Sequence, residues 1–286
     1  MDRKKFEKKN KKENYDAKKK YGQNFLNDSE LAYKILEAAK IEKNDEIIEI
    51  GPGLGFLTEN LIEKAGYVTA FEIDSDLIPL LNKKFKNKEN FLLVHKDFME
   101  VNLEKFLENK KNVKVVANIP YYITSPIINK LLEFRKNISE IYLMVQKEVA
   151  ERITSKPRSK NMSLLTHGVQ FFAEAEYLFT VSREKFEPVP KVDSAFLKIV
   201  VLKNGIYEEQ ISEDEYFKYL KAAFSNKRKS IANNLTELGF IKETIGNILE
   251  KLGKTKLART EEFSVQEFID FVKMLKKEEI RNKAGE

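Results

Sequence analysis

The sequence has no cysteine and only two histidines, His95 and His167, among its 286 residues. Without cysteine the chain forms no disulfide, has no thiolate nucleophile and holds no cysteine-ligated zinc. Two histidines do not predict a histidine-rich metal centre, so we read both as packing residues. No run approaches the roughly 18 apolar residues of a membrane span, and the basic N-terminus lacks the apolar core of a secretory signal. These absences favour a cytoplasmic protein with no metal and no membrane partner.

Positive charge is concentrated at the N-terminus. Residues 1–20 hold ten Lys/Arg and four acids, so they carry the whole net charge of +6, and the rest of the chain is balanced. Such an arm is either a phosphate-binding tail or a disordered, solvated end. We expect residues 1–20 to be disordered and leave the role of residues 1–17 open.

A strand, a glycine turn and a helix follow each other at the start of the balanced region. Residues 46–50 (Glu-Ile-Ile-Glu-Ile) read as a strand, Gly51 and Gly53 lie in the turn, and a helix follows. This is the first half of a βαβ nucleotide-binding unit. A dinucleotide site needs a small residue where this chain has Phe56. The pattern therefore favours a nucleoside cofactor without pyrophosphate.

Potential site residues stand at the ends of four successive predicted strands. Gly51 follows the first and Glu72 ends the second, at residues 67–72, where an acid can accept hydrogen bonds from ribose hydroxyls. Asp97 follows a strand at residues 91–95, and Asn118 follows one at residues 113–117. The carboxyl ends of such strands form the ligand-binding edge of an open α/β sheet. Asp97 has the alternative role of a helix cap.

The loop Asn118-Ile119-Pro120-Tyr121 predicts a site for a flat base that carries an amine. Pro120 fixes its own φ and favours an extended Ile119, so the loop is stiff. The Asn118 oxygen and a loop carbonyl can accept the two N–H groups of an adenine amine, while Tyr121 stacks on the ring. With an electrophilic methyl group nearby, catalysis becomes a matter of positioning. The alternative is that Asn118 stabilises a turn and Tyr121 caps the core.

Further along, Ser125-Pro126 predicts the start of a helix at residues 127–134. A fifth strand is expected at residues 141–145, and residues 195–202 are expected to close the sheet. The polar segment 154–162 reads as a mobile loop or a phosphate contact. Residues 21–26, before the first helix, read as a linker that packs one phenylalanine.

After residue 205 the pattern becomes helical. Helices are predicted at residues 216–224, 231–238, 241–252 and 265–275, the last with a capping box from Ser264 and Glu267. We therefore expect an α/β domain at residues 21–204 and a small all-helical domain at residues 205–286. Lys227, Arg228 and Lys229 suit contacts with RNA phosphates. A solvated surface is the alternative for this charged run.

Together these motifs resemble the ribosomal RNA adenine N6-dimethyltransferases over most of the chain. The matching segments are 22–26 (Gly-Gln-Asn-Phe-Leu), 49–55 (Glu-Ile-Gly-Pro-Gly-Leu-Gly), 72–74 (Glu-Ile-Asp), 118–121 (Asn-Ile-Pro-Tyr), 146–148 (Gln-Lys-Glu), 186–195 and 226–234. The resemblance implies a Rossmann-like class I S-adenosylmethionine-dependent methyltransferase domain followed by a helical domain.

The resemblance also assigns roles to residues. It implies S-adenosylmethionine contacts from Asn24, Leu26, Gly51, Gly53, Glu72, Asp97 and Asn118. It implies a target-base site formed by Asn118, Pro120 and Tyr121, with Phe186 on the opposite side of the base. The roles of Asn24, Leu26 and Phe186 rest on the resemblance alone.

Within the family the sequence is most similar to the small-subunit enzymes. Gly51-Pro52-Gly53, Asp193-Ser194 and the Lys227–Lys229 run distinguish it from the macrolide-resistance enzymes that modify large-subunit RNA. The implied reaction is dimethylation of two adjacent adenosines in a hairpin loop near the 3′ end of 16S RNA. The implied partner is an immature 30S subunit, and we expect a monomer. Two alternatives remain, a ribosome-assembly factor with secondary methylation and, more weakly, a DNA adenine methyltransferase.

Overall fold

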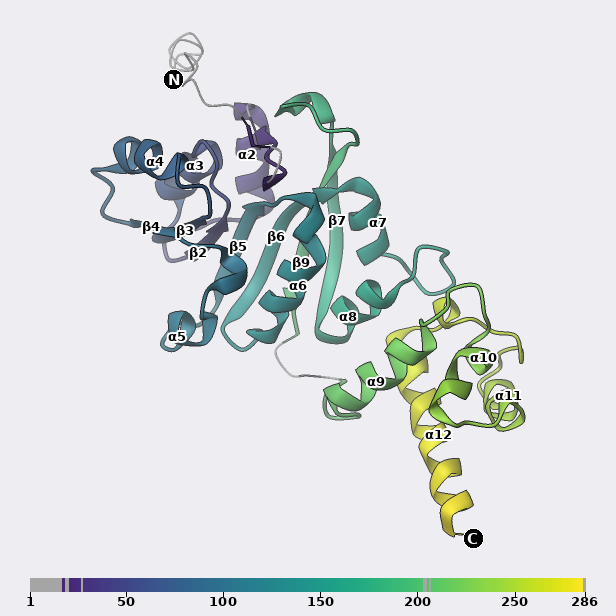
Figure 1. The fold of residues 1–286 in the computed structure, drawn as a ribbon. Helices are drawn as coiled ribbons and strands as arrows, with labels where there is room; N and C mark the ends of the chain where they lie inside the picture. Colours follow the sequence, from purple (N-terminus) through teal and green to yellow (C-terminus); the bar gives the residue numbers. More distant parts are fainter. Residues whose placement is uncertain (1–16, 19–20, 27, 203–204, 206, 285–286) are drawn as a thin grey trace.

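A computed structural model describes residues 17–18, 21–26, 28–202, 205 and 207–284. Its centre is a seven-stranded sheet in the order β4-β3-β2-β5-β6-β9-β7 (Figure 1). The five strands from β4 to β6 are parallel, and β9 and β7 are antiparallel additions at one end. The strands are β2 (Glu46–Ile50), β3 (Tyr67–Glu72), β4 (Phe91–His95), β5 (Val113–Asn118), β6 (Ile138–Gln146), β7 (Ala173–Val181) and β9 (Ser194–Val201).

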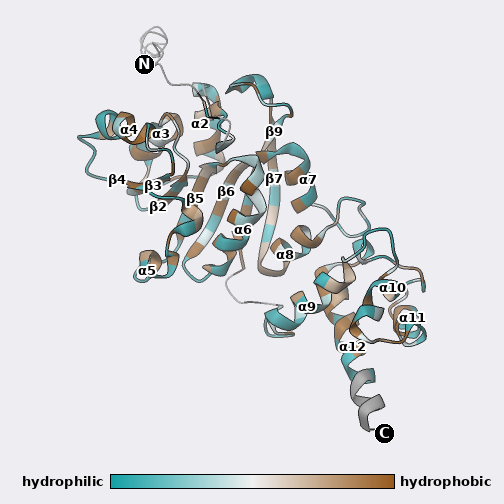
Figure 2. Cartoon of the chain, in the orientation of Figure 1, coloured by the Kyte–Doolittle hydropathy of each residue, from teal (hydrophilic) through white to brown (hydrophobic). Residues whose placement is uncertain are grey.

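Helices cover both faces of the sheet, because alternate residues of each buried strand point to opposite sides. In β5, Val116 joins one buried cluster, while Val115 and Ala117 join the other. The first cluster holds α2 (Ser29–Ala38), α3 (Phe56–Lys64) and α4 (Leu77–Phe85) against the sheet. The second holds α5 (Leu103–Leu107), α6 (Thr124–Glu133), α7 (Lys147–Ile153) and α8 (Leu164–Phe172). In Figure 2, α4 and α5 each carry both brown and teal residues, as amphipathic covering helices do.

The C-terminal part of the chain is helical. It consists of α9 (Glu213–Ala223), α10 (Ile231–Leu235), α11 (Lys242–Lys251) and α12 (Val265–Ala284). The predicted capping box of the last helix is present, since the Glu267 carboxylate accepts from the Ser264 backbone at 2.8 Å and the Ser264 hydroxyl accepts from the Glu267 backbone at 3.1 Å. These helices share a continuous apolar cluster with α8 and the sheet. A domain boundary near residue 205 stays a prediction.

An aromatic contact joins this helical part to the sheet layer. The Phe171 ring of α8 stacks on the Tyr216 ring of α9 with centroids 4.3 Å apart, and the Tyr216 hydroxyl bonds His167 Nδ1 at 2.9 Å. The prediction that His167 is a packing residue is confirmed, because its side chain is fully buried. The same prediction for His95 is wrong, because His95 is exposed.

The structure changes several expectations about local structure. Ser125 is not a helix cap, because the 3₁₀ turn Tyr121–Ile123 runs directly into α6 and the helix already begins at Thr124. Strand β9 does not close the sheet, because β7 pairs along its outer side and forms the edge. Neither α8 nor β7 was expected from the sequence. The linker at residues 21–26 contains β1 (Phe25–Leu26), which pairs with β8 (Phe186–Glu187).

Two further expectations concern the ends of the chain and the membrane. Most of the basic arm at residues 1–20 lies outside the described residues, which there include only 17 and 18. Among the helices that the structure describes, none combines the length and apolar character needed to cross a bilayer.

Candidate active site

A cleft lies at the carboxyl edge of the parallel strands, where β2 and β5 are neighbours. The chain turns from β2 toward β3 on one side and continues through β5 on the other. This is the switch point at which open α/β sheets bind ligands. The cleft brings together most of the predicted site residues, namely Asn24, Leu26, Gly51, Gly53, Glu72, Asp97, Asn118, Pro120 and Tyr121.

The glycine turn gives the cleft its floor. Gly53 has a φ of +58°, and a Cβ added there would lie 2.8 Å from the Phe25 ring. A side chain at this position would therefore be strained and would also push Phe25 out of place. Helix α3 begins at Phe56, directly after this turn.

Glu72 ends β3 with its carboxylate almost fully buried. One carboxylate oxygen accepts from the Gly53 backbone N–H at 3.2 Å and the other from the Asp74 backbone N–H at 2.9 Å. Burial raises the pKa of Glu72, and these two hydrogen bonds oppose the rise. The side chain is thus fixed in the cleft by two loops, in a position to accept hydroxyl hydrogen bonds.

Asp97 lies at the other wall of the cleft, after β4. Its side chain accepts from the Met99 backbone N–H at 2.8 Å and caps the short turn Phe98–Glu100. Asp97 therefore both caps this turn and lines the cleft. The alternative role as a cap is confirmed, whereas the contact of Asp97 with a cofactor stays a prediction that its half-buried place beside the cleft allows.

Asn118 is the last residue of β5, and its amide orientation is fixed by a neighbour. Its Nδ2 donates to the backbone carbonyl of Asn24 at 3.0 Å. A carbonyl accepts only, so the nitrogen of the amide must face Asn24. The side-chain oxygen is the remaining group, and among the described residues no donor binds it. Asn118 therefore offers the cleft a hydrogen-bond acceptor.

The Tyr121 ring is held by its hydroxyl. That hydroxyl bonds the Ser194 hydroxyl at 2.6 Å, and Ser194 is fully buried at the first position of β9. Pro120, with φ of −60° and ψ of 134°, starts the turn that carries the tyrosine. Burial raises the pKa of Tyr121, and the hydrogen bond to Ser194 opposes the rise. Tyr121 is a neutral, oriented ring at the mouth of the cleft.

Phe186 is placed differently from the other predicted residues. Its side chain is 2% exposed, it pairs with Leu26 across the β1–β8 ribbon, and it does not line the cleft. In this structure it therefore packs in the core and does not face Tyr121 across an open site. Its contact with a target base stays a prediction.

The segment Tyr21–Leu26, called the strap below, was missed when the sequence was read without the resemblance. All six of its residues line the cleft. The Gly22-Gln23-Asn24 run offers only a weak signal, a glycine with two amides in an otherwise apolar segment. Its partners lie far along the chain, so the local sequence does not reveal them.

Glu49 is a second residue that the sequence reasoning did not assign. It is buried in β2, lines the cleft, and its Oε2 has no hydrogen-bond partner among the described residues. Burial raises the pKa of Glu49 to about 8, with the Thr58 hydroxyl acting to lower this pKa and the negative charge of Glu72 acting to raise it. An unpartnered buried oxygen beside the cleft fits a ligand that brings its own donor. The residues present therefore suit a nucleoside that also carries an amine.

The basic run at residues 227–229 lies away from the cleft, in the turn between α9 and α10. Asn234 shapes this turn by donating to the carbonyls of Ala223 and Asn226, at 2.6 and 3.0 Å. All three basic side chains are exposed, and within the part of the chain that the structure describes none forms an ion pair. Lys227 Nζ donates to the Lys160 carbonyl at 3.0 Å. These exposed positive charges fit a phosphate contact, which stays a prediction.

Comparison with known proteins gives a consistent result. The family model described as "Ribosomal RNA adenine dimethylase" matches residues 14–277. A protein of Fusobacterium nucleatum named "Ribosomal RNA small subunit methyltransferase A" is 52% identical over 261 residues, which is 91% of this chain and 98% of that protein. A protein of the same name from Streptococcus sanguinis is 42% identical, covering 92% and 93% of the two chains.

Two solved structures share the fold and part of the sequence. A dimethyladenosine transferase from Plasmodium falciparum has a TM-score of 0.74 and 28% identity, and the match covers 88% of this chain and 98% of that one. The 23S rRNA methyltransferase ErmE has a TM-score of 0.69 and 26% identity, covering 88% and 100% of the chains. In both cases the match covers too much of this chain to be confined to the α/β part.

Proposed function

The chain belongs to the ribosomal RNA adenine dimethylase family, and from that premise we propose that it methylates adenosine N6 in small-subunit RNA. It is an S-adenosylmethionine-dependent methyltransferase with a Rossmann-like fold. Its substrate is a pair of adjacent adenosines in a hairpin loop near the 3′ end of 16S RNA, and its product is N6,N6-dimethyladenosine. The observation that carries the proposal is the orientation of Asn118, whose side-chain oxygen faces the cleft because its nitrogen is bound to Asn24.

The residues present fit the methyl donor. Glu72 accepts hydrogen bonds from ribose hydroxyls, Asp97 and the strap residues Asn24 and Leu26 form the walls, and the Gly51–Gly53 turn allows close approach of the ligand. The unpartnered Glu49 oxygen adds an acceptor for an amino group. When bound, S-adenosylmethionine supplies an electrophilic methyl group on a sulfonium.

The chain's own contribution is to hold the target amine. The Asn118 oxygen accepts one amine N–H, a carbonyl of the Ile119–Pro120 segment accepts the other, and both favour a nitrogen whose lone pair points away from the ring. Tyr121, oriented by Ser194, stacks on the base and fixes its plane. The rate then depends on alignment, and no strong general base is needed.

The small-subunit substrate is favoured over the large-subunit one. The relatives with 52% and 42% identity carry small-subunit names, whereas the 23S rRNA methyltransferase is 26% identical. We propose an immature 30S subunit as the binding partner, with Lys227, Arg228 and Lys229 in contact with RNA phosphates. We also propose a monomer that acts in the cytoplasm.

Mapping of modified adenosines tests this function. In cells that lack the protein, N6,N6-dimethyladenosine is expected to disappear from the 16S hairpin loop, and the wild-type chain restores it while Asn118→Ala does not. Restoration by Asn118→Ala, or loss of a methyl group from 23S RNA instead, would show that the assignment is wrong.

The assembly-factor alternative makes a separate prediction. If binding is the main role, Asn118→Ala still cosediments with immature subunits and still affects their maturation. Cosedimentation without methylation therefore separates the two activities, and loss of cosedimentation in Asn118→Ala argues against a binding role that is independent of the cleft.

A further inference from the structure

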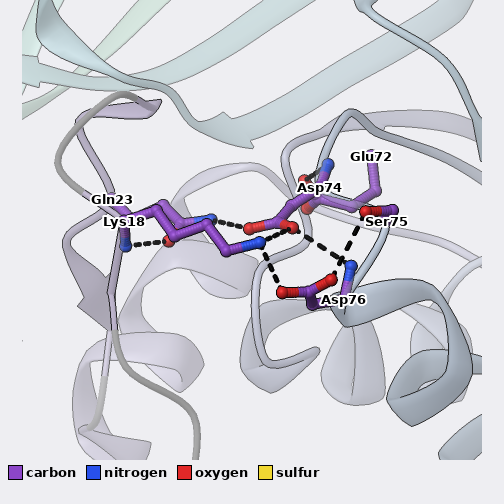
Figure 3. Close-up of polar contacts among 6 residues, drawn as sticks. All are labelled: Lys18, Gln23, Glu72, Asp74, Ser75 and Asp76. Carbon is purple, nitrogen blue, oxygen red and sulfur yellow. Dashed lines mark hydrogen bonds and ion pairs between the residues drawn. The ribbon is translucent and has the colours of Figure 1, made fainter.

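Three acids stand close together at the carboxyl end of β3. They are Glu72, Asp74 and Asp76, and Figure 3 shows that the side chains of Lys18 and Gln23 reach toward the second of them. The Lys18 ammonium lies 2.5 Å from Asp74 Oδ1 and 2.6 Å from Asp76 Oδ2. Gln23 Nε2 donates to Asp74 Oδ2 at 3.0 Å. We call these contacts the Asp74 network.

Asp74 differs from Glu72 in its position. Its side chain is fully buried, and it does not line the cleft. Its backbone N–H donates to Glu72 at 2.9 Å, so it is one bond away from the carboxylate that faces the cofactor. Burial is the largest cause of the raised pKa of Glu72, the backbone hydrogen bonds from Asp74 and Gly53 lower this pKa, and the negative charge of Asp74 raises it. A positive partner for Asp74 therefore also favours a charged Glu72.

The strap connects this network to the rest of the site. Gln23 Oε1 accepts from the Lys18 backbone N–H at 2.7 Å, and the Lys18 carbonyl accepts from the Tyr21 backbone N–H at 3.1 Å, so Lys18 is bound to the strap by its backbone. Further along the strap, the Phe25 ring covers Gly53 and the Asn24 carbonyl binds Asn118. The strap thus joins three parts of the site. These are the loop that carries Asp74 and Asp76, the glycine turn at Gly51–Gly53, and the catalytic loop Asn118–Tyr121.

The position of Gly22 adds a close contact. Its φ is +60°, and a Cβ added there would lie 3.2 Å from the Tyr122 ring. The strap lies against the tyrosine next to Tyr121, so a displaced strap would free one side of the catalytic loop. Because β1 pairs with β8 at its other end, the strap is held at both ends.

We propose that Asp74 is a positioning residue for S-adenosylmethionine, acting with Lys18 and Gln23 to hold the strap over the cleft. It does not touch the cofactor. It fixes the Glu72 carboxylate from one side and the strap from the other, so one buried acid aligns two walls of the same cleft. This inference rests on the proposed function, because it concerns the methyl donor of that reaction.

The Asp74 network depends on the pairing of a buried negative charge with the Lys18 ammonium. Asp74 is a fully buried carboxylate, and removing the Lys18 ammonium takes away a positive charge that compensates it beside Glu72. The loop then relaxes to let water reach the acid, which moves the Glu72 carboxylate and releases the strap at Lys18. The expected result is weaker cofactor binding with an intact catalytic loop once the cofactor is bound.

The test measures cofactor affinity and turnover separately in the full-length protein. Lys18→Met keeps the length of the side chain and removes its charge, and we expect the Kd for S-adenosylmethionine to rise about tenfold. The kcat at saturating cofactor is expected to stay within about twofold, so the change appears in KM. Lys18→Arg keeps the charge and is expected to restore most of the affinity.

Asp74→Asn and the double variant test the coupling. Lys18 and Asp74 share an ion pair, so Lys18→Met combined with Asp74→Asn is expected to bind no more weakly than the weaker single variant. If the two losses multiply, the residues act independently and the proposal is wrong. Should Asp74→Asn unfold, Lys18→Met alone still decides, since the Lys18 side chain is only partly buried.

A matched control is available at the far end of the sheet. Lys110 pairs with Glu46 at 2.9 Å, lies against a Phe106 ring and has a side-chain exposure of 28%, close to the 27% of Lys18. Lys110→Met is expected to leave the Kd unchanged. Wild-type affinity in Lys18→Met would overturn the inference, whereas a wild-type protein that fails to bind S-adenosylmethionine would overturn the proposed function itself.

Discussion

The side-chain nitrogen of Asn118 donates to the backbone carbonyl of Asn24 at 3.0 Å, across 94 residues of sequence. This bond joins the end of β5 to the strap and decides which end of the amide faces the cleft. It couples the group that holds the target amine to a wall of the cofactor site.

Substitutions of Asn118 are expected to separate its effect on the target amine from its effect on the cofactor site. Asn118→Ala removes the acceptor, and we expect methyl transfer to fall about 100-fold or more, by analogy with removal of one preorganised hydrogen bond in other active sites. Asn118→Asp keeps an acceptor but turns a carboxylate oxygen toward the Asn24 carbonyl. We therefore expect Asn118→Asp to lower cofactor affinity more than Asn118→Ala does.

Transfer of labelled methyl groups to under-methylated small subunits measures the first effect, and titration calorimetry measures the second. Thermal unfolding provides the control for folding. Full-rate transfer by Asn118→Ala would contradict the role given to the loop.

The bond between Tyr121 and Ser194 predicts a coupled pair. Ser194→Ala and Tyr121→Phe each remove the 2.6 Å hydrogen bond but leave the aromatic ring and most of the packing in place. We expect each to reduce transfer by about fivefold to tenfold, and the double variant to be no slower than the slower single one. Ser194→Thr keeps the hydroxyl and is the conservative control.

A double-variant cycle on single-turnover rates checks this. Rates that fall multiplicatively would mean that Ser194 acts on something other than the tyrosine ring. Unchanged rates in Ser194→Ala would mean that the ring keeps its orientation without the bond.

The exposed turn at residues 227–229 predicts a change in salt dependence. Replacing Lys227, Arg228 and Lys229 with alanine removes up to three phosphate contacts, and the slope of log affinity against log salt is expected to flatten by about 2 to 3. Cofactor affinity should not change, because the turn lies away from the cleft.

A matched variant replaces three exposed lysines on the other side of the protein, Lys83, Lys86 and Lys88. Its slope is expected to match that of the wild type. If the variant of residues 227–229 has the same slope as this control, the basic turn does not contact RNA phosphates and is part of the solvated surface.

His167 predicts a loss of stability in mild acid. Burial among the Tyr216, Phe224 and Phe268 rings lowers the pKa of His167 to about 4, with the backbone of Phe263 opposing the shift slightly. The unfolded chain takes up the proton near pH 6.5 and the folded chain does not. Stability is therefore complete above pH 6.5 and falls as the pH drops toward 4.

The expected loss in the free energy of unfolding is about 2 kcal/mol between pH 7.5 and pH 5. Urea unfolding across this range measures it. His167→Gln is expected to be less stable at pH 7.5 and to show a flatter dependence on pH. Parallel curves for the two proteins would mean that His167 takes up its proton as readily in the folded state as in the unfolded chain.

The parallel part of the fold follows from the sequence with little error. Residues 46–50, 67–72 and 91–95 were predicted as strands and are β2, β3 and β4. Each is a short apolar run bounded by turn residues, so local pattern and burial agree. The ligand-binding edge followed from these strands, because the carboxyl ends of parallel strands meet on one side.

Strand β7 and helix α8 could not be predicted from the sequence in the same way. Residues 173–181 read Ala-Glu-Ala-Glu-Tyr-Leu-Phe-Thr-Val, which mixes helix-favouring and strand-favouring residues. The strand forms because β9 offers it an open edge, and an edge strand carries exposed charges such as Glu174 on its outer surface. That partner is a tertiary feature which the local sequence does not contain.

The residues of the site also divide into those that the sequence pattern predicted and those that it did not. Glu72, Asp97 and Asn118 were found because each ends or follows a strand. The strap, the Ser194 hydroxyl and the buried Asp74 were not found by pattern, because their roles come from contacts across many residues of sequence.

The contacts of the strap also become available in a fixed order during synthesis. Its partners Asp74, Asn118 and Phe186 all follow it in the chain, so they are translated after it. A nascent chain that already has β2, β3 and β5 still lacks Phe186, the residue that pairs with Leu26. The full set of contacts that hold this wall of the cleft therefore requires translation through β8.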